Sequence, residues 1–182
     1  MARILSLLLL GLGGCAQIPK GATPVTGFEV QRYLGTWYEI ARLDHSFERG
    51  LTHVNAAYSL NPDGSVRVLN RGYNPQTQRW KEATGRAVFV GARDVGQLRV
   101  SFFGPFYGAY NIIALDTTGY GHALICSHNL SYLWILARTP TLPEATVAAL
   151  KQQAALLGFD TAALILVPQA DPPAAATRSG TP

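Results

Sequence analysis

Apolar and polar residues alternate along most of the chain in short stretches, which turn-forming residues separate. A period of two is typical of β-strands with one buried face. The pattern predicts eight strands, over residues 37–43, 52–60, 65–72, 79–90, 97–103, 108–115, 121–127 and 131–138. Short connections such as Asn61-Pro62-Asp63-Gly64 indicate antiparallel neighbours in chain order. We therefore predict an all-β domain, an eight-stranded antiparallel up-and-down β-barrel.

One helix is predicted after the last of these strands. Thr141-Leu142-Pro143-Glu144 has the spacing of a capping box, with proline early in the first turn. An apolar stripe at helical spacing follows, formed by Val147, Leu150, Ala154 and Leu157. Gly158 suits the C-terminal end of such a helix, and residues 163–167 predict a short extra strand. The C-terminal helix is expected to pack on the wall of the barrel.

Strand alternation also divides the side chains between the inside and the outside of the barrel. The predicted inner face combines small apolar residues with a few aromatic rings. We expect the cavity to be lined by Val54, Ala56, Tyr58, Val68, Asn70, Ala83, Ala87, Phe89, Val100, Phe102, Tyr110, Trp134 and Leu136. The alanines leave volume that costs stability unless a ligand fills it, and an apolar cavity suits an acyl chain. A tightly packed core, with alanines opposite the large rings, is the alternative.

Two connections are expected at the same rim of the barrel, because hairpin ends alternate along the chain. The first covers residues 44–51 and carries Phe47, and the fifth is Gly104-Pro105-Phe106-Tyr107-Gly108. Phe47, Phe106 and Tyr107 are therefore predicted to surround the mouth. A lid function and simple packing on the barrel are both open for these aromatic side chains.

The N-terminus has the order of a secretory leader. Arg3 precedes an apolar stretch over residues 4–12 that is too short to span a bilayer. Leu12-Gly13-Gly14-Cys15 resembles the bacterial lipobox, which implies a signal peptide over residues 1–14 and lipidation of Cys15. Ala16 favours sorting to the outer membrane, and an ordinary signal peptide that contains a cysteine is the alternative. No disulfide is then expected for Cys126.

The rest of the chain divides by composition. Residues 15–27 are interpreted as a lipidated tether, residues 28–169 as the barrel domain, and residues 170–182 as a disordered tail rich in Pro, Ala, Thr, Ser and Gly. Fully extended, such a tether reaches on the order of 30 Å.

Several sequence motifs, in the order in which they occur along the chain, resemble those of the lipocalin family. The resemblance is strongest to the bacterial outer-membrane lipoproteins of this family. Gly35-Thr36-Trp37 opens the first strand, and Leu136-Ala137-Arg138-Thr139-Pro140 closes the last long one. Between them, Asp116 matches the second motif, although the tyrosine that normally follows it is delayed to Tyr120. The resemblance implies structural roles for Gly35, Trp37, Asp116 and Arg138, with Arg138 over the Trp37 ring. The delay puts a structural role for Tyr120 in doubt.

For function, the resemblance implies binding of fatty acids or lysophospholipids for storage, transport or repair at the cell envelope. The protein would be an outer-membrane lipoprotein with its barrel facing the periplasm. An occluded-barrel interaction or structural module without a transported ligand is the alternative, and a homodimer is left open.

The net charge of the chain and its lack of catalytic motifs limit the other possible classes of function. The net charge is +4 and the pI about 9.3, without a Lys/Arg run, so no nucleic-acid partner is expected. Because no nucleophile-elbow, His-Glu-x-x-His or Cys-x-x-Cys motif occurs, we expect neither an enzyme nor a cofactor or metal. A tetrapyrrole would need an inward histidine, and His53 is predicted to point outward. Glu39 is predicted to point inward and to pair with Lys81 or Arg138.

Overall fold

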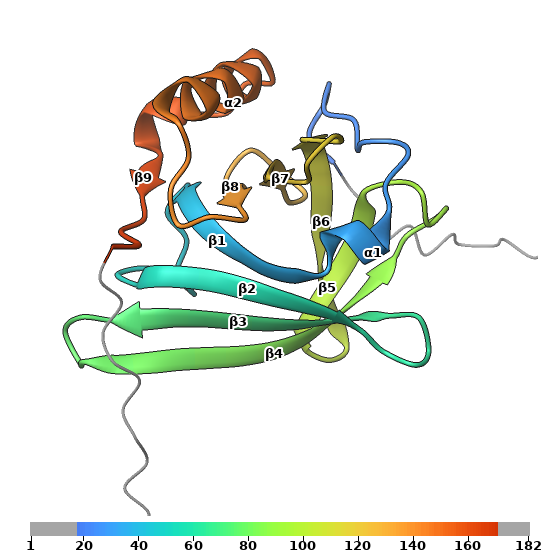
Figure 1. Ribbon diagram of the computed structural model, residues 1–182, viewed down its shortest axis with the longest axis horizontal. Helices are drawn as coiled ribbons and strands as arrows, with labels where there is room; N and C mark the ends of the chain where they lie inside the picture. Colours follow the sequence, from blue (N-terminus) through green and yellow to red (C-terminus); the bar gives the residue numbers. More distant parts are fainter. Residues whose placement is uncertain (1–17, 171–182) are drawn as a thin grey trace, which may run out of the picture.

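The computed structural model describes residues 18–170; the predicted signal peptide, Cys15 and residues 171–182 lie outside this range. Eight antiparallel strands follow one another around a barrel (Figure 1). They are β1 Gly35–Arg42, β2 Thr52–Leu60, β3 Val66–Asn74, β4 Arg79–Phe89, β5 Gln97–Phe103, β6 Phe106–Leu115, β7 His122–Cys126 and β8 Leu133–Ala137. The barrel is closed because β1 pairs with both β2 and β8. A ninth strand, β9 Ile165–Leu166, pairs with β1. The predicted fold class is confirmed.

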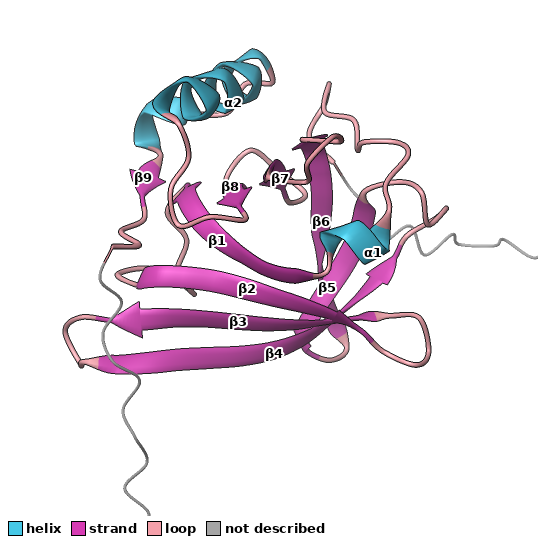
Figure 2. Cartoon of the chain, viewed as in Figure 1, coloured by secondary structure: helices cyan, strands magenta, loops and turns pink. Residues whose placement is uncertain are grey.

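Within residues 18–170, two α-helices accompany the barrel, and Figure 2 shows them in cyan against the magenta strands. α2, Glu144–Leu156, is the predicted helix, and Gly158 just beyond it has a φ of +89° that suits a helix end. The predicted capping box does not form, because no side chain caps the first turn of α2. α1, Val30–Tyr33, was not predicted; at four residues it is too short to carry a periodic signal. A 3₁₀ turn, Thr161–Ala163, joins α2 to β9.

The barrel wall separates two hydrophobic clusters. Outside, Leu150 and Ala154 of α2 pack on the outward side chains of β1, β7 and β8, among them Ile40, Leu124 and Ile135. Inside, a second cluster surrounds Trp37. Because α2 covers their outer face, β7 and β8 are buried almost throughout, and their sequences are nearly continuous apolar runs.

The closed end of the barrel is built around Trp37, whose side chain is fully buried. The Arg138 guanidinium lies 4.2 Å from the centre of its ring, which confirms the predicted stack. Arg138 also donates hydrogen bonds to the carbonyl oxygens of Thr36 and Arg32, at 3.0 and 2.6 Å. Gly35 has a φ of +94°, a conformation that favours glycine. This end therefore combines stacking with backbone hydrogen bonds.

The Asp116 loop also supports the closed end. The Asp116 carboxylate accepts hydrogen bonds from the backbone N–H groups of Thr118, Gly119 and Gly121, which lower its pKa. Tyr120 is buried, and its hydroxyl accepts a hydrogen bond from the Glu29 N–H at 3.0 Å. The delayed tyrosine therefore has a structural role, because its hydroxyl ties the Asp116 loop to the segment before α1.

Residues 18–27, predicted as part of a tether, instead lie against the barrel. The Val25 N–H donates to the Ile112 carbonyl at 2.9 Å, and the Val25 carbonyl accepts from the Gly96 N–H at 2.8 Å. Ala22 is buried, and Ile18 packs against the cluster under α2. Composition alone indicated a linker, but main-chain hydrogen bonds fix this segment. Among the described residues, no helix has the length and apolar character needed to span a membrane.

Candidate functional site

A cavity of about 100 Å³ opens inside the barrel, toward the end opposite α1. Apolar and aromatic side chains form most of its wall. It is lined by Glu39, Phe47, Glu48, Val54, Asn55, Ala56, Tyr58, Asn70, Val100, Phe102, Tyr110, Ile125, Trp134 and Leu136. Nine of the thirteen predicted lining residues are among them, namely Val54, Ala56, Tyr58, Asn70, Val100, Phe102, Tyr110, Trp134 and Leu136. Alternation along the strands therefore identified most of the wall.

Four predicted lining residues lie elsewhere. Val68 and Ala87 are buried deeper in the barrel, and Phe89 packs on the same inner cluster. Ala83 is exposed to solvent. It belongs to the part of β4 that runs past β5, because the β4–β5 ladder begins only at Arg86. Alternation gives the direction of a side chain but not its depth in the barrel.

Of the three aromatic residues predicted at the mouth, Phe47 is the one that lines the cavity. Phe47 both lines the cavity and is 58% exposed, and Phe106 is 79% exposed. Phe103, which was not singled out from the sequence, is 81% exposed beside it. Tyr107 carries the Arg99 guanidinium 4.9 Å from its ring centre. The β5–β6 turn therefore presents two phenylalanine rings to the surroundings.

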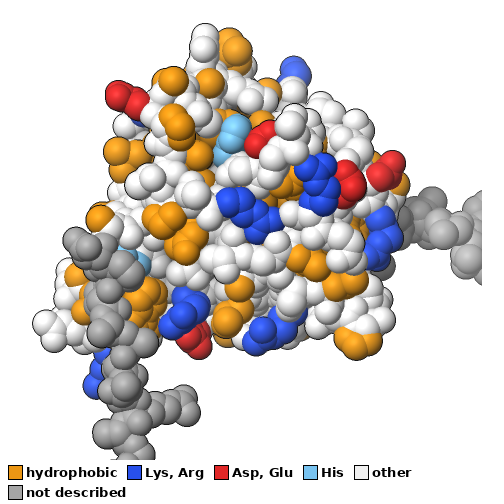
Figure 3. Space-filling model, in the orientation of Figure 1, with side chains coloured by type: hydrophobic (Ala, Val, Ile, Leu, Met, Phe, Trp, Pro, Cys, Tyr) orange, Lys and Arg blue, Asp and Glu red, His pale blue; other side chains and the backbone are white. Residues whose placement is uncertain are grey.

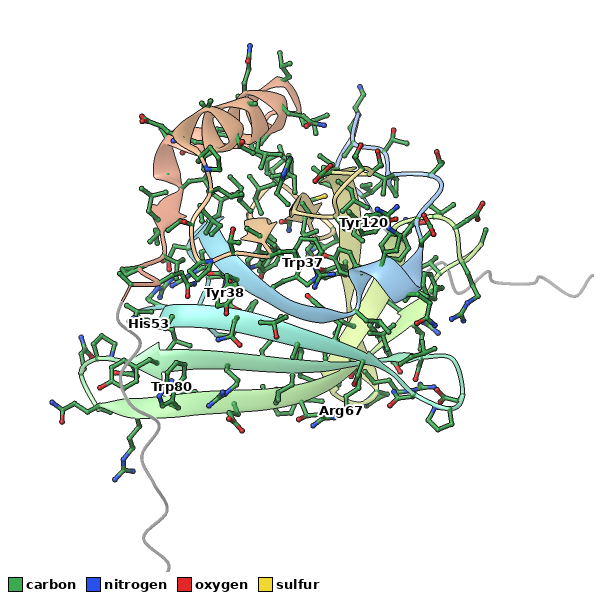
Figure 4. All side chains as sticks on the ribbon, in the orientation of Figure 1. Trp37, Tyr38, His53, Arg67, Trp80 and Tyr120 are labelled. Carbon is green, nitrogen blue, oxygen red and sulfur yellow. The ribbon has the colours of Figure 1, made fainter. Side chains whose placement is uncertain are left out.

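Other aromatic groups at the open end stay out of the cavity. Figure 4 shows His53 and Trp80 at the end of the molecule away from Tyr120. The His53 ring bonds the Thr52 hydroxyl and the Ala170 carbonyl and does not line the cavity. On the face seen in Figure 3, lysine and arginine side chains are scattered rather than gathered in one patch. Among residues 18–170, no group of three potential metal ligands comes together.

A buried charged cluster forms one side of the cavity wall. Glu39 and Glu48 are 3% and 8% exposed, and the Arg42 guanidinium is 2% exposed. Arg42 donates to a Glu39 carboxylate oxygen at 2.6 Å and to the Glu48 carbonyl at 2.9 Å. Glu39 points inward as predicted, but its partner is Arg42 rather than Lys81 or Arg138. Sequence reasoning missed Glu48 because it enters the barrel from a loop.

Burial sets the protonation of this cluster. It raises the pKa of Glu39, and the neighbouring Glu48 carboxyl raises that pKa further, against the opposing effect of Arg42. Burial likewise raises the pKa of Glu48, although the Trp134 indole N–H donates to it at 3.1 Å. The His45 ring lies 3.2 Å from Glu48, yet burial and Arg42 lower the pKa of His45 to about 4. His45 is therefore neutral at pH 7.

Cys126 does not extend this cluster into a nucleophilic site. Its side chain is fully buried, and burial raises the pKa of the thiol to about 12. A thiol of this kind is inert, because the thiolate is the reactive form.

Residues 28–169 match the family model described as a lipocalin-like domain. The chain belongs to the lipocalin family. Lipocalins bind small hydrophobic ligands, and this chain has an apolar cavity inside its barrel.

Related proteins agree with this assignment. The lipocalin is 52% identical over 151 residues to the outer membrane lipoprotein Blc of Escherichia coli strain K12, covering 83% of this chain and 85% of the relative. It is 49% identical over 158 residues to the Blc protein of Vibrio cholerae, covering 87% and 92%. The solved structure of insecticyanin from the tobacco hornworm superposes with a TM-score of 0.66 at 20% identity, over 83% of this chain and 86% of insecticyanin. That likeness shows a shared fold.

Proposed function

We propose that this lipocalin is a membrane-anchored lipid-binding protein. It holds fatty acids or lysophospholipids in its cavity for storage, transport or repair at the cell envelope. Cys15 would carry the anchor in the outer membrane, with the barrel facing the periplasm. The observation that carries the proposal is the apolar cavity, open beside Phe47 and bounded by Tyr58 and Tyr110.

An acyl chain fits the chemistry of this cavity. Each buried methylene contributes about 0.8 kcal/mol, so an acyl tail binds without a charged anchor. Binding entropy and desolvation offset part of this gain. The buried carboxyl groups of Glu39 and Glu48 disfavour a carboxylate deep in the cavity. The tail is therefore expected inside, with the polar end at the mouth.

The relatives support the location. The names of the Escherichia coli and Vibrio cholerae proteins describe outer membrane lipoproteins. A Cys15→Ser variant is expected to move from the membrane fraction to the soluble periplasmic fraction. Retention in the membrane fraction after a high-salt wash would contradict anchoring through Cys15.

A second candidate is an interaction module that uses the rim. Phe103 and Phe106 are 81% and 79% exposed, which is unusual for phenylalanine on a free surface. In this alternative the rim docks a partner and the cavity carries no ligand. Lipid binding inside the barrel separates the two candidates.

The test uses the soluble form that begins after Cys15, delipidated and titrated with a lysophosphatidylcholine and with palmitate. Tryptophan fluorescence and calorimetry are followed in parallel. Trp134 lines the cavity, whereas Trp80 lies outside it. We expect saturable binding whose fluorescence change is lost in Trp134→Phe and kept in the matched control Trp80→Phe. Absence of calorimetric binding for both lipids would favour the interaction module.

A further inference from the structure

Three tyrosines meet across the interior of the barrel. Tyr33 comes from α1, Tyr58 from β2 and Tyr110 from β6. The Tyr110 hydroxyl lies 2.7 Å from the Tyr33 hydroxyl and 3.0 Å from the Tyr58 hydroxyl. Burial raises the pKa of all three phenols, so the groups stay neutral. We call Tyr33, Tyr58 and Tyr110 the tyrosine layer.

A second, smaller space lies beyond the tyrosine layer, toward α1. It measures about 20 Å³, room for about one water molecule. It is lined by the three tyrosines and by six other residues, among them Val66, Ala87 and Leu98. Apart from the three tyrosines, all of these residues are apolar, so the space suits methylene groups better than water.

Tyr58 and Tyr110 line both spaces. Their rings are therefore the partition between the ligand cavity and the smaller space. The Tyr110 hydroxyl also bridges the other two phenols, but the rings themselves separate the two spaces. Val54, on the cavity wall, and Tyr58 are four residues apart on β2, which is about 13 Å along a strand. A chain that enters beside Phe47 thus meets the tyrosine layer after a short path.

We propose that the rings of Tyr58 and Tyr110 set the length of the acyl chain that this lipocalin binds. The smaller space beyond them is an acyl-terminus pocket that the tyrosine layer keeps closed. Each additional methylene group adds affinity only until the chain reaches the rings of Tyr58 and Tyr110. Longer chains keep their additional methylenes outside the apolar cavity, where they contribute little. This inference rests on the proposed function and names the residues that give it chain-length selectivity.

The test measures affinity by calorimetry for saturated straight-chain fatty acids from octanoate to stearate. Wild type is compared with Tyr110→Ala, which removes the ring, and with Tyr110→Phe, which removes only the hydroxyl. In wild type, affinity is expected to rise by up to about fourfold per methylene and then to stop rising. We call the chain length at which affinity stops rising the break. In Tyr110→Ala the break is expected to move to longer chains, because the two spaces join. In Tyr110→Phe the break stays at the wild-type length.

Several results would overturn the inference. They are a Tyr110→Ala protein with an unchanged break, a Tyr110→Phe protein whose break moves as far as that of Tyr110→Ala, and a wild type without a break. Tyr58→Ala provides a second removal of the partition if Tyr110→Ala does not fold. Absence of binding to every fatty acid in wild type would also overturn the inference, and the proposed function would fall with it only if lysophosphatidylcholine did not bind either. Binding with an unshifted break would remove only the role of the tyrosines.

Discussion

Replacing Arg42 by methionine tests whether the charged cluster on the cavity wall is held together by this one cation. The Arg42 guanidinium is 2% exposed, so it has almost no access to water. It donates to Glu39 at 2.6 Å and to the carbonyls of Glu48 and Leu51 at 2.9 and 3.3 Å. Methionine keeps much of the apolar stem and removes all three bonds.

The expected loss of stability follows from what Arg42 leaves behind. Removing one partner of a buried ion pair costs about 3–5 kcal/mol, because the other charge stays buried without compensation. Here the remaining group is Glu39, and two carbonyl oxygens also lose a donor. The free energy of unfolding should therefore fall by about 3–5 kcal/mol at pH 7.5.

The stability loss in Arg42→Met should depend on pH, because it involves the protonation of Glu39. Arg42 lowers the pKa of Glu39 against burial, so its removal raises that pKa further. A carboxyl whose pKa is raised by folding stabilises the folded state below its unfolded pKa. That stability is lost as the pH rises toward the folded pKa, at up to about 1.4 kcal/mol per pH unit for one proton. Both proteins keep Glu39 protonated at low pH, so the penalty of Arg42→Met should be smallest there and should grow once the pH exceeds the pKa of Glu39 in the wild type.

The assay is urea unfolding of the form that begins after Cys15, followed by circular dichroism at both pH values. Arg49→Met is the matched control, since Arg49 forms an exposed pair with Asp44 on the same loop and should leave the midpoint nearly unchanged. In a Glu39→Gln background, the Arg42→Met penalty should shrink, because no carboxylate is left unpaired. A penalty below about 1 kcal/mol, or one that is larger at pH 5 than at pH 7.5, would refute this account of the cluster.

Three further predictions address the backbone, the thiol and the cavity. Gly35→Ala should lower the free energy of unfolding by about 1–2 kcal/mol in urea titrations, because φ at this position is +94°; an unchanged midpoint would contradict this. Cys126 should resist iodoacetamide at pH 8 in the native state and react once guanidinium chloride unfolds the protein, as mass spectrometry can show; native alkylation would mean that the thiol is accessible. Gly85→Ala should weaken palmitate binding severalfold in calorimetry, because the added Cβ would lie 2.8 Å from the ring of Phe102, which lines the cavity, and 2.9 Å from the Ser101 carbonyl oxygen, so this part of the wall must shift. The control is Gly91→Ala, whose Cβ would meet nothing within 4 Å, and equal affinities in the two variants would refute the cavity argument.

The barrel could be predicted from the sequence because its main determinant is local. Each strand alternates between an inner and an outer face, and one short turn joins it to the next. That logic placed Val54, Ala56 and Tyr58 on the cavity wall, and it placed Glu39 inside. Two positions on β4 show what strand alternation cannot predict. Ala83 and Ala87 share a face, yet one is exposed and the other is buried, because only part of β4 pairs with β5.

The features that give the cavity its polarity and depth are not local. Glu48 reaches the wall from a loop and bonds Trp134, which lies 86 positions later in the chain. Tyr33 reaches Tyr110 from a helix of four residues, too short for periodicity to reveal. Such contacts depend on how a closed barrel brings distant segments together. Alternation therefore predicted the wall, whereas the charged cluster and the tyrosine layer required the structure.

The packing of residues 18–27 changes how far the barrel can lie from the proposed anchor. An extended tether over residues 15–27 would let the barrel stand on the order of 30 Å from the bilayer. Ile18 instead packs against the cluster under α2, and Val25 bonds the backbone of Ile112. Cys15 lies only three positions before Ile18, a reach of about 10 Å at most. Acyl chains on Cys15 would therefore hold the barrel close to the membrane surface.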